Sequence, residues 1–117
     1  MGTPGAALFN QSVTATVPTG TTDSYDPTGY VGGTTNRLIL TPTDSTSTLA
    51  GLLSSGVADG FAVQIYNPSS TLSLTFLHQS SLATNDQFNC VNGEPVVLEP
   101  FDTTIACYIA GSGWTLI

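Results

Sequence analysis

Few residues in this chain have side chains that catalysis commonly uses, and none stands in a recognisable catalytic pattern. His78 is the only histidine. Nucleophilic catalysis would need it to act as a base beside a serine or cysteine. No serine lies in the Gly-x-Ser-x-Gly sequence that exposes a nucleophile at a strand-to-helix turn. We therefore expect His78 to have a structural role at the end of a strand, and the protein not to be an enzyme.

Two carboxylates, Asp23 and Asp26, lie close together in the sequence and could share acid and base chemistry. Aspartate is also common in turns, because its side chain bonds its own backbone, and Asp26-Pro27 fits that use. The pair lacks the alternating oxygen ligands and closing Glu of a calcium loop. The glycine-rich run 29–34 has no lysine to meet a phosphate, so it indicates flexibility. We expect neither a metal nor a cofactor.

The two cysteines, Cys90 and Cys107, could pair by number alone, yet both lie inside expected strands and lack metal-ligand spacing. The N-terminus has neither the basic start nor the apolar run of a signal peptide. The sequence therefore predicts synthesis in the cytoplasm without export. In that compartment thiols stay reduced, so we expect two free, buried cysteines.

The charge balance excludes whole classes of partner. The chain has one cation, Arg37, against eight carboxylates, for a formal net charge of -7. Phosphate backbones and anionic membrane surfaces would be repelled. No stretch approaches the roughly 18 apolar residues that a membrane helix needs. We expect no binding to nucleic acid or membrane.

The composition and the turn residues between apolar segments predict a β protein. Thr and Ser supply 31 of the 117 residues, with no obvious repeat, and β-branched residues favour a pleated surface. One short helix is expected between Asp44 and Gly56, because Leu49, Leu52 and Leu53 lie three and four residues apart. The other segments read as about eight short strands. Those expected are 12–17, 37–41, and three hairpins, namely 61–66 with 72–78, 87–91 with 95–99, and 103–110 with 114–117.

These elements predict an all-β fold, a single β-sandwich or jelly-roll-like domain with an extended N-terminal arm. Residues 1–35 are expected to hold the arm, the first strand and a long contact loop, and residues 36–117 the sandwich body. Ordering a backbone costs about 1–2 kcal/mol per residue, and the first segment has few large apolar groups to offset it. Its order would then depend on a partner. The side chains expected at that interface are Leu8, Phe9, Tyr25, Tyr30 and Val31, with Trp114 as a further interface or core anchor.

From Asn36 onward the order of motifs resembles a β-domain that recurs in tailed-phage virion proteins, both head decoration proteins and tail-fibre modules. The elements that carry the resemblance are 37–40, 49–52, 58–61, 65–67, 72–78, 85–88, 97–100 and a closing Trp114. Asp86 departs from the pattern, because such domains often place a basic residue between that Asn and Phe. The family is structural and supplies no catalytic residues.

The resemblance implies a virion protein made in the host cytoplasm. The role that we expect is a capsid decoration, or cement, protein on the outer surface of a phage head, bound to the major capsid protein and self-associated as a homotrimer. The alternative is a tail-fibre or receptor-binding module that recognises a glycan through Tyr25, Tyr30 or Trp114. Copy number separates the two, since a shell protein is present in hundreds of copies and a fibre in a handful.

Overall fold

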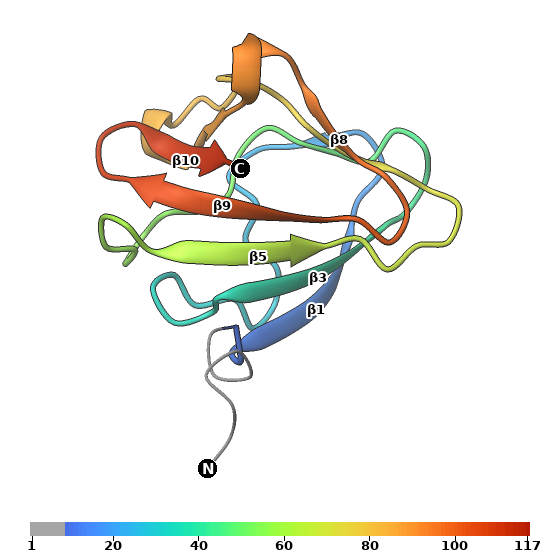
Figure 1. Ribbon diagram of the computed structural model, residues 1–117, viewed down its shortest axis with the longest axis horizontal. Coiled ribbons are helices and arrows are strands. Elements are labelled where there is room, and N and C mark those ends of the chain that lie inside the picture. The colour runs from blue at the N-terminus through green and yellow to red at the C-terminus, as the bar shows by residue number, and fades with distance from the viewer. Residues whose placement is uncertain (1–8) are drawn as a thin grey trace.

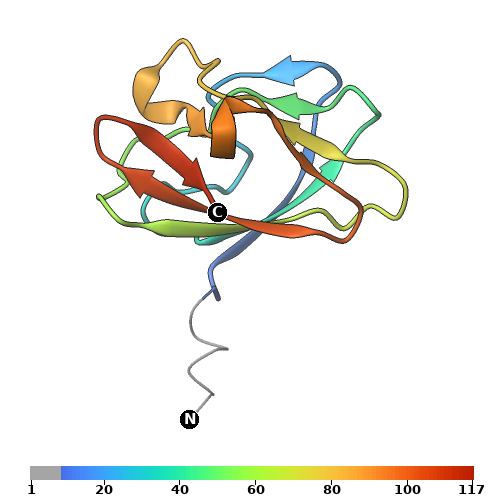
Figure 2. The same cartoon turned by 45° about the horizontal axis from the view of Figure 1, so that its top comes forward.

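The computed structural model describes residues 9–117, and within them the fold is all-β, as predicted (Figure 1). Strands form two sheets that face each other across the core (Figure 2). The six-stranded sheet has the order β1-β3-β5-β9-β10-β7 and the four-stranded sheet the order β2-β4-β6-β8. The bounds of the first six strands are β1 Ser12–Val17, β2 Thr21–Thr22, β3 Arg37–Pro42, β4 Thr48–Leu49, β5 Ala62–Tyr66 and β6 Leu74–Phe76. Those of the remainder are β7 Phe88–Asn89, β8 Val96–Leu98, β9 Thr103–Ile109 and β10 Gly113–Leu116, with single 3₁₀ turns at Thr84–Asp86 and Val91–Gly93.

The first six strands stack as a short, solenoid-like set of three coils. Each coil places one strand in the large sheet and the next in the small sheet, and equivalent strands pair in parallel. Thr21, Thr48 and Thr75 lie opposite one another, a step of 27 residues in the small sheet, while Ser12, Arg37 and Gln64 are opposed in the large sheet at steps of 25 and 27 residues. A jelly roll is built from antiparallel strands. Its antiparallel pattern is absent from these coils.

A proline marks the same corner of every coil. Pro18 follows β1, Pro42 is the last residue of β3, and Pro68 comes two residues after β5. Proline has no N–H to donate to a sheet and disfavours continuation of a strand. At the second corner, Thr43 follows Pro42 and connects the first two coils. Its N–H and its hydroxyl both donate to the Val17 carbonyl, at 3.1 and 2.6 Å. The corners therefore stop the strands and stack on one another.

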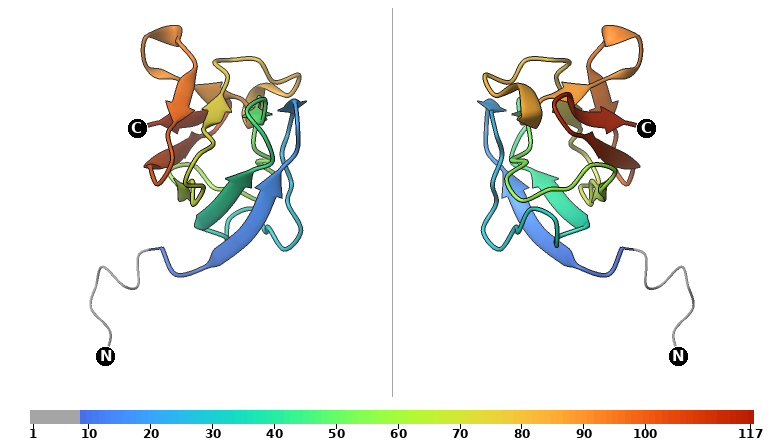
Figure 3. Two further views of the ribbon diagram at one scale, coloured as in Figure 1. Left: turned by 90° about the vertical axis from the view of Figure 1, so that its right-hand side faces the viewer. Right: turned by 90° about the vertical axis from the view of Figure 1, so that its left-hand side faces the viewer.

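The C-terminal strands close one end of this stack. β9 pairs antiparallel with both β5 and β10, while β7 pairs parallel with β10, and β8 antiparallel with β6. The two sheets also meet at one seam, where His78 bridges Phe88. The third and last coil is therefore covered, and the first coil is left at the opposite end of the molecule (Figure 3).

The core lies between the sheets and is filled by alternate residues of each strand. Phe76 and Phe88 meet edge to face with ring centroids 5.1 Å apart, and Trp114 is fully buried. One polar side chain, Asn67, is fully buried as well. Its Nδ2 donates to the carbonyls of Leu72, Leu98 and Glu99, so it ties the corner after β5 to the segment that follows β8.

Several predictions about local structure were wrong. Residues 44–56 contain β4, and no α-helix lies in the described chain. Leu49 and Leu52 instead point into the core from two sides of the second coil. Two expected hairpins are not hairpins, because the strands before and after Asn67-Pro68 and Asn92-Gly93 enter different sheets. The hairpin of β9 and β10 is confirmed.

The division expected at residue 36 does not separate two structural units. Residues 12–35 make the first coil, in which β1 pairs along its length with β3. Val17, Tyr25 and Tyr30 belong to the same buried cluster as the later strands. The parallel pairing explains the error, because it joins segments that are distant in sequence and have little apolar pattern of their own.

Candidate binding site at the open end of the stack

The first coil presents free strand edges, since β1 is the outermost strand of the large sheet and β2 of the small sheet. Backbone hydrogen bonds show which groups of β1 face β3. The carbonyls of Gln11 and Val17 accept from the β3 side, from Arg37 and Thr43 respectively. In a parallel ladder alternate residues bond the same neighbour. The N–H and C=O groups of Ser12, Thr14 and Thr16 therefore point away from β3.

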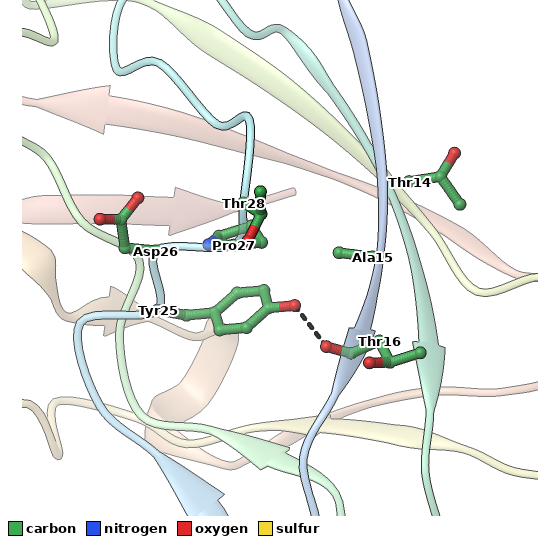
Figure 4. Close-up of a pocket in the computed structure, with 7 residues that line it drawn as sticks. All are labelled: Thr14, Ala15, Thr16, Tyr25, Asp26, Pro27 and Thr28. Carbon is green, nitrogen blue, oxygen red and sulfur yellow. Dashed lines mark hydrogen bonds between the residues drawn. The ribbon is translucent and has the colours of Figure 1, made fainter.

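A pocket of about 370 Å³ lies at this edge, lined by Thr14, Ala15, Thr16, Tyr25, Asp26, Pro27 and Thr28. In the close-up, the methyl of Ala15 points toward Tyr25 while the Thr14 and Thr16 side chains point to the other side of β1 (Figure 4). The two threonines thus line the pocket with backbone. The Tyr25 hydroxyl donates to the Thr16 carbonyl at 2.6 Å, which spans the pocket and occupies one outward group of the edge.

The wall opposite β1 is held in place by contacts to the second coil. Tyr25 forms a parallel bridge with Leu52, and the Tyr30 hydroxyl donates to the Leu53 carbonyl at 2.7 Å. Burial, with smaller effects from the carboxylates of Asp26 and Asp86, raises the pKa of Tyr30 well above its usual range, which favours the protonated hydroxyl that donates this bond. Tyr25 and Tyr30, which lie in the contact loop expected at residues 18–35, are therefore held against the second coil.

The predicted interface residues fall into two groups. Tyr25, Tyr30 and Trp114 are buried, at 6%, 8% and 0% exposure, and their rings belong to the core. Trp114 also donates from Nε1 to the Leu52 carbonyl. Of the three rings only that of Tyr25 lines the pocket, and Tyr30 and Trp114 are not among the residues that line it. Val31 is exposed, Phe9 is half-buried, and Leu8 lies outside the described residues.

Asp23 links the first coil to the loop 79–86, a contact that sequence reasoning missed. Its carboxylate accepts hydrogen bonds from the N–H groups of Ser24 and Leu82, at 2.8 and 2.9 Å. Burial raises the pKa of Asp23, but the hydrogen bonds from Ser81, Leu82 and Ser24 outweigh that effect and lower it. The carboxylate thus holds the loop whose tip is Leu82, a side chain left 99% exposed.

Asp86 is the acid that departs from the phage-domain pattern, and its surroundings explain why an acid fits. It is buried, and its Oδ1 accepts from the N–H and the hydroxyl of Ser54, at 2.9 and 2.5 Å. A basic side chain at this position would face donors rather than acceptors. Asp86 is therefore a structural link between the second coil and the turn at 84–86.

Of the residues with catalytic side chains, His78 and Cys90 lie side by side away from the pocket, whereas Asp26 lines it. The N–H of Cys90 donates to His78 Nδ1 at 3.0 Å, which fixes the imidazole at the seam between the sheets. Cys90 is buried and Cys107 half-buried, and both are free thiols in the structure. Burial raises the pKa of Cys90, which disfavours the reactive thiolate.

No cluster of three or more His, Cys, Asp or Glu side chains that could hold a metal occurs among residues 9–117. Within the same range no helix has the length and apolar character needed to cross a membrane. No protein-family model matches the chain, and no curated protein or solved structure matches it either. The strand edge and the pocket of the first coil form the candidate binding site.

Proposed function

We propose that this protein is a structural binding module, a capsid decoration protein that attaches to the outer surface of a phage head and stabilises it. The observation that carries the proposal is the first coil, whose β1 edge is uncharged from Ser12 to Val17 and, among residues 9–117, pairs with no strand on its outer side, where the Tyr25 hydroxyl bonds the Thr16 carbonyl. Exposed edges are templates for association with another chain. A protein that works by assembly uses such an edge, whereas a monomeric enzyme has to block it.

The surface chemistry supports the same role. The outer row of the small sheet consists of Thr21, Thr48 and Thr75 beside Val97, which are neutral side chains. The resemblance of the motifs after Asn36 to virion β-domains supplies the location. The partner would be the major capsid protein of the phage head. No reaction is assigned to the chain.

Binding to shells tests the proposal. Purified chain is added to heads assembled without it, and the bound amount is measured by sedimentation together with the temperature at which the heads rupture. The proposal expects saturable binding and a higher rupture temperature. Heads that bind no chain, or whose rupture temperature does not change at saturation, would contradict it. Lysozyme of similar mass serves as the non-binding control.

A second candidate function is glycan recognition by a tail-fibre module, which the pocket at β1 favours. The Asp26 carboxylate and Thr28 hydroxyl are exposed beside it, and such groups bind sugar hydroxyls. In this second proposal Asp26 and Thr28 bind the glycan, in place of the rings of Tyr25, Tyr30 and Trp114 that the sequence suggested. Screening the chain on a glycan array decides it, with Asp26→Ala as the variant that should lose binding and Asp59→Ala, also exposed, as the control.

A further inference from the structure

The six-stranded sheet has one side that points away from the core. In β3, β5 and β9 every second residue is buried, and the residues between them point outward and are half-buried or exposed. The small sheet lies on the opposite side of the large one (Figure 2). The outward side chains of β1, β3, β5, β9 and β10 therefore form one surface, which we call the outer face.

The charges of the chain are distributed unevenly around this outer face. The five strands that form it contain no Asp or Glu, although the chain has eight carboxylates. Its only Lys or Arg, Arg37, is on the outer face. Asp102 directly precedes β9, and Asp59 accepts from the N–H of Ala110 just after β9, so acids stand at the border. The outer face is thus locally cationic on a protein of net charge -7.

Apolar side chains occupy the centre of the outer face. Ile39 lies opposite Tyr66, and Ile105 is the diagonal neighbour of Tyr66 on β9. Toward β10, Ile109 and Ile117 are 42% and 78% exposed. The solvated side of a sheet is ordinarily polar. Tyrosine and arginine among apolar groups, without acids or lysine, are typical of the centre of a protein–protein interface.

The dimensions of the outer face also favour a protein as its occupant. Neighbouring strands lie about 4.8 Å apart, so the five strands span about 19 Å. Small molecules bind in concave pockets, and the described pocket lies beyond β1, on the other side of that strand from the Thr14 and Thr16 side chains. A broad sheet surface is suited to contact with another folded surface.

Arg37 has a donor that the described chain does not satisfy. Its Nε is buried, yet no acceptor among residues 9–117 bonds it. A buried donor without an acceptor is unfavourable, because it has lost water and gained no partner. The planar guanidinium presents its donors in pairs that match the two oxygens of a carboxylate. An acid is therefore the chemical group that best complements this side chain, and the strands of the outer face supply none.

We propose that the outer face docks on a different protein, whose contacting surface is apolar and has a carboxylate that accepts from Arg37. The identity of that partner rests on the proposed function, and it is the major capsid protein. A second copy does not meet the requirement, because a two-fold contact of the outer face with itself opposes two guanidinium groups and brings no carboxylate side chain. Nucleic acid also presents anions, but the net charge repels it.

Arg37→Met tests the guanidinium. Methionine keeps an unbranched apolar stem and removes the unsatisfied donor, so the free chain should unfold at the same or a higher temperature. Its binding to heads assembled without the chain, measured by sedimentation, should be at least about thirtyfold weaker, because the partner's acid loses its cation. Arg37→Lys keeps the charge without the paired donors and should bind with intermediate affinity.

Tyr66→Ala tests the apolar centre in the same assay. Tyrosines at the centre of an interface contribute strongly to affinity, so this variant should bind heads at least about tenfold more weakly. Val97→Ser is the matched control, since Val97 is an exposed apolar residue of β8 in the small sheet. It should bind as the unmodified chain does.

The possible results separate this docking surface from the proposed function. If the unmodified chain binds heads and both Arg37→Met and Tyr66→Ala bind equally well, the outer face is not the docking surface, while the proposed function stands. A marked fall in the unfolding temperature of free Arg37→Met would also overturn the proposal, because the guanidinium would then have a partner within the chain. Self-association of the free chain that Arg37→Met abolishes would assign the outer face to a second copy instead. Heads that bind no unmodified chain would contradict the proposed function and, with it, this docking surface.

Discussion

Asn67 shows at the scale of a single residue how a polar group holds two parts of the fold together. Its amide is fully buried, donates to three carbonyls and accepts from the Ser69 N–H. Proline follows it, which the sequence indicated as a turn. The sequence could not show that the side chain reaches across to the segment after β8, because those partners are 31 and 32 residues away.

Replacing Asn67 should therefore be costly. Asn67→Ala leaves three carbonyls, the buried one of Leu98 and the part-buried ones of Leu72 and Glu99, without this donor, and we expect a loss of about 2–4 kcal/mol in the free energy of unfolding. Asn67→Asp should cost more at pH 7, because a carboxylate cannot donate to carbonyls. Urea unfolding measures both. Asn89→Ala is the control, since that amide is only partly buried and should cost under about 1 kcal/mol. Equal losses at the two positions would contradict the assignment.

Asp23 predicts how stability depends on pH. Its pKa in the folded protein lies below the ordinary value of 3.8. A lowered folded pKa means that the contribution is fully present above the unfolded pKa and is lost as pH falls through the folded value. Hydrogen bonds from Thr46 lower the pKa of Asp44 in the same direction. We expect stability to fall below about pH 4.

The Asp23→Asn variant isolates this part of the acid response. It should be less stable than the unmodified chain at pH 6, and its stability should fall less steeply from pH 5 to pH 2. The Leu82 amide should also exchange faster at pH 6, because its acceptor has lost its charge. Identical pH profiles for the two proteins would show that the carboxylate has no such role.

The turn between β9 and β10 shows how an element depends on particular glycines. Gly113 has φ of +106°, and a Cβ there would collide with the carbonyl of Gln87, which also accepts from the Trp114 N–H. Gly111 has φ of +79° but open space around it. The sequence predicted this hairpin from its glycines. It could not distinguish the two, because the collision involves Gln87, which is distant in the sequence and lies just before β7.

We expect Gly113→Ala to destabilise the protein by more than about 3 kcal/mol, from backbone strain together with displacement of β7. Gly111→Ala introduces the backbone strain of a positive φ without a collision, and it should lower the free energy of unfolding by about 1 kcal/mol. Thermal unfolding followed by circular dichroism compares the two variants directly. Similar losses would mean that the contact with Gln87 relaxes without cost.

The parallel coils explain which elements could be read from the sequence. Strands at 12–17, 37–42 and 103–109 follow their residue patterns, because alternation and β-branching are local signals. Sheet membership is not local, and turn residues such as Asn67-Pro68 bound a coil corner as well as a hairpin. The proline corners at 18, 42 and 68 were the available signal for a repeat. Leu49 and Leu52 are both buried although they lie three residues apart, because the chain bends at Ala50 between them. This spacing is the same as that of a helix.

At the scale of the whole molecule, the structure predicts which truncations fold. Removing residues 1–8 leaves β1 and the Gln11 contacts intact, so we expect the same unfolding temperature within a few degrees. Removing residues 1–35 exposes Leu38 and Leu40, each fully buried, and should leave an unfolded or aggregated product. Circular dichroism and gel filtration compare the products. A stable, soluble 36–117 fragment would contradict the unity of the three coils.

Quantitative mass spectrometry of purified virions tests the proposal that this chain is an assembly component of a phage head. Labelled peptides of the chain are measured against peptides of the major capsid protein in particles treated to remove their tails. The account predicts hundreds of copies per particle, retained on the tailless heads. A handful of copies lost with the tails would assign the chain to a fibre. Its absence from washed particles would contradict a structural role in the virion.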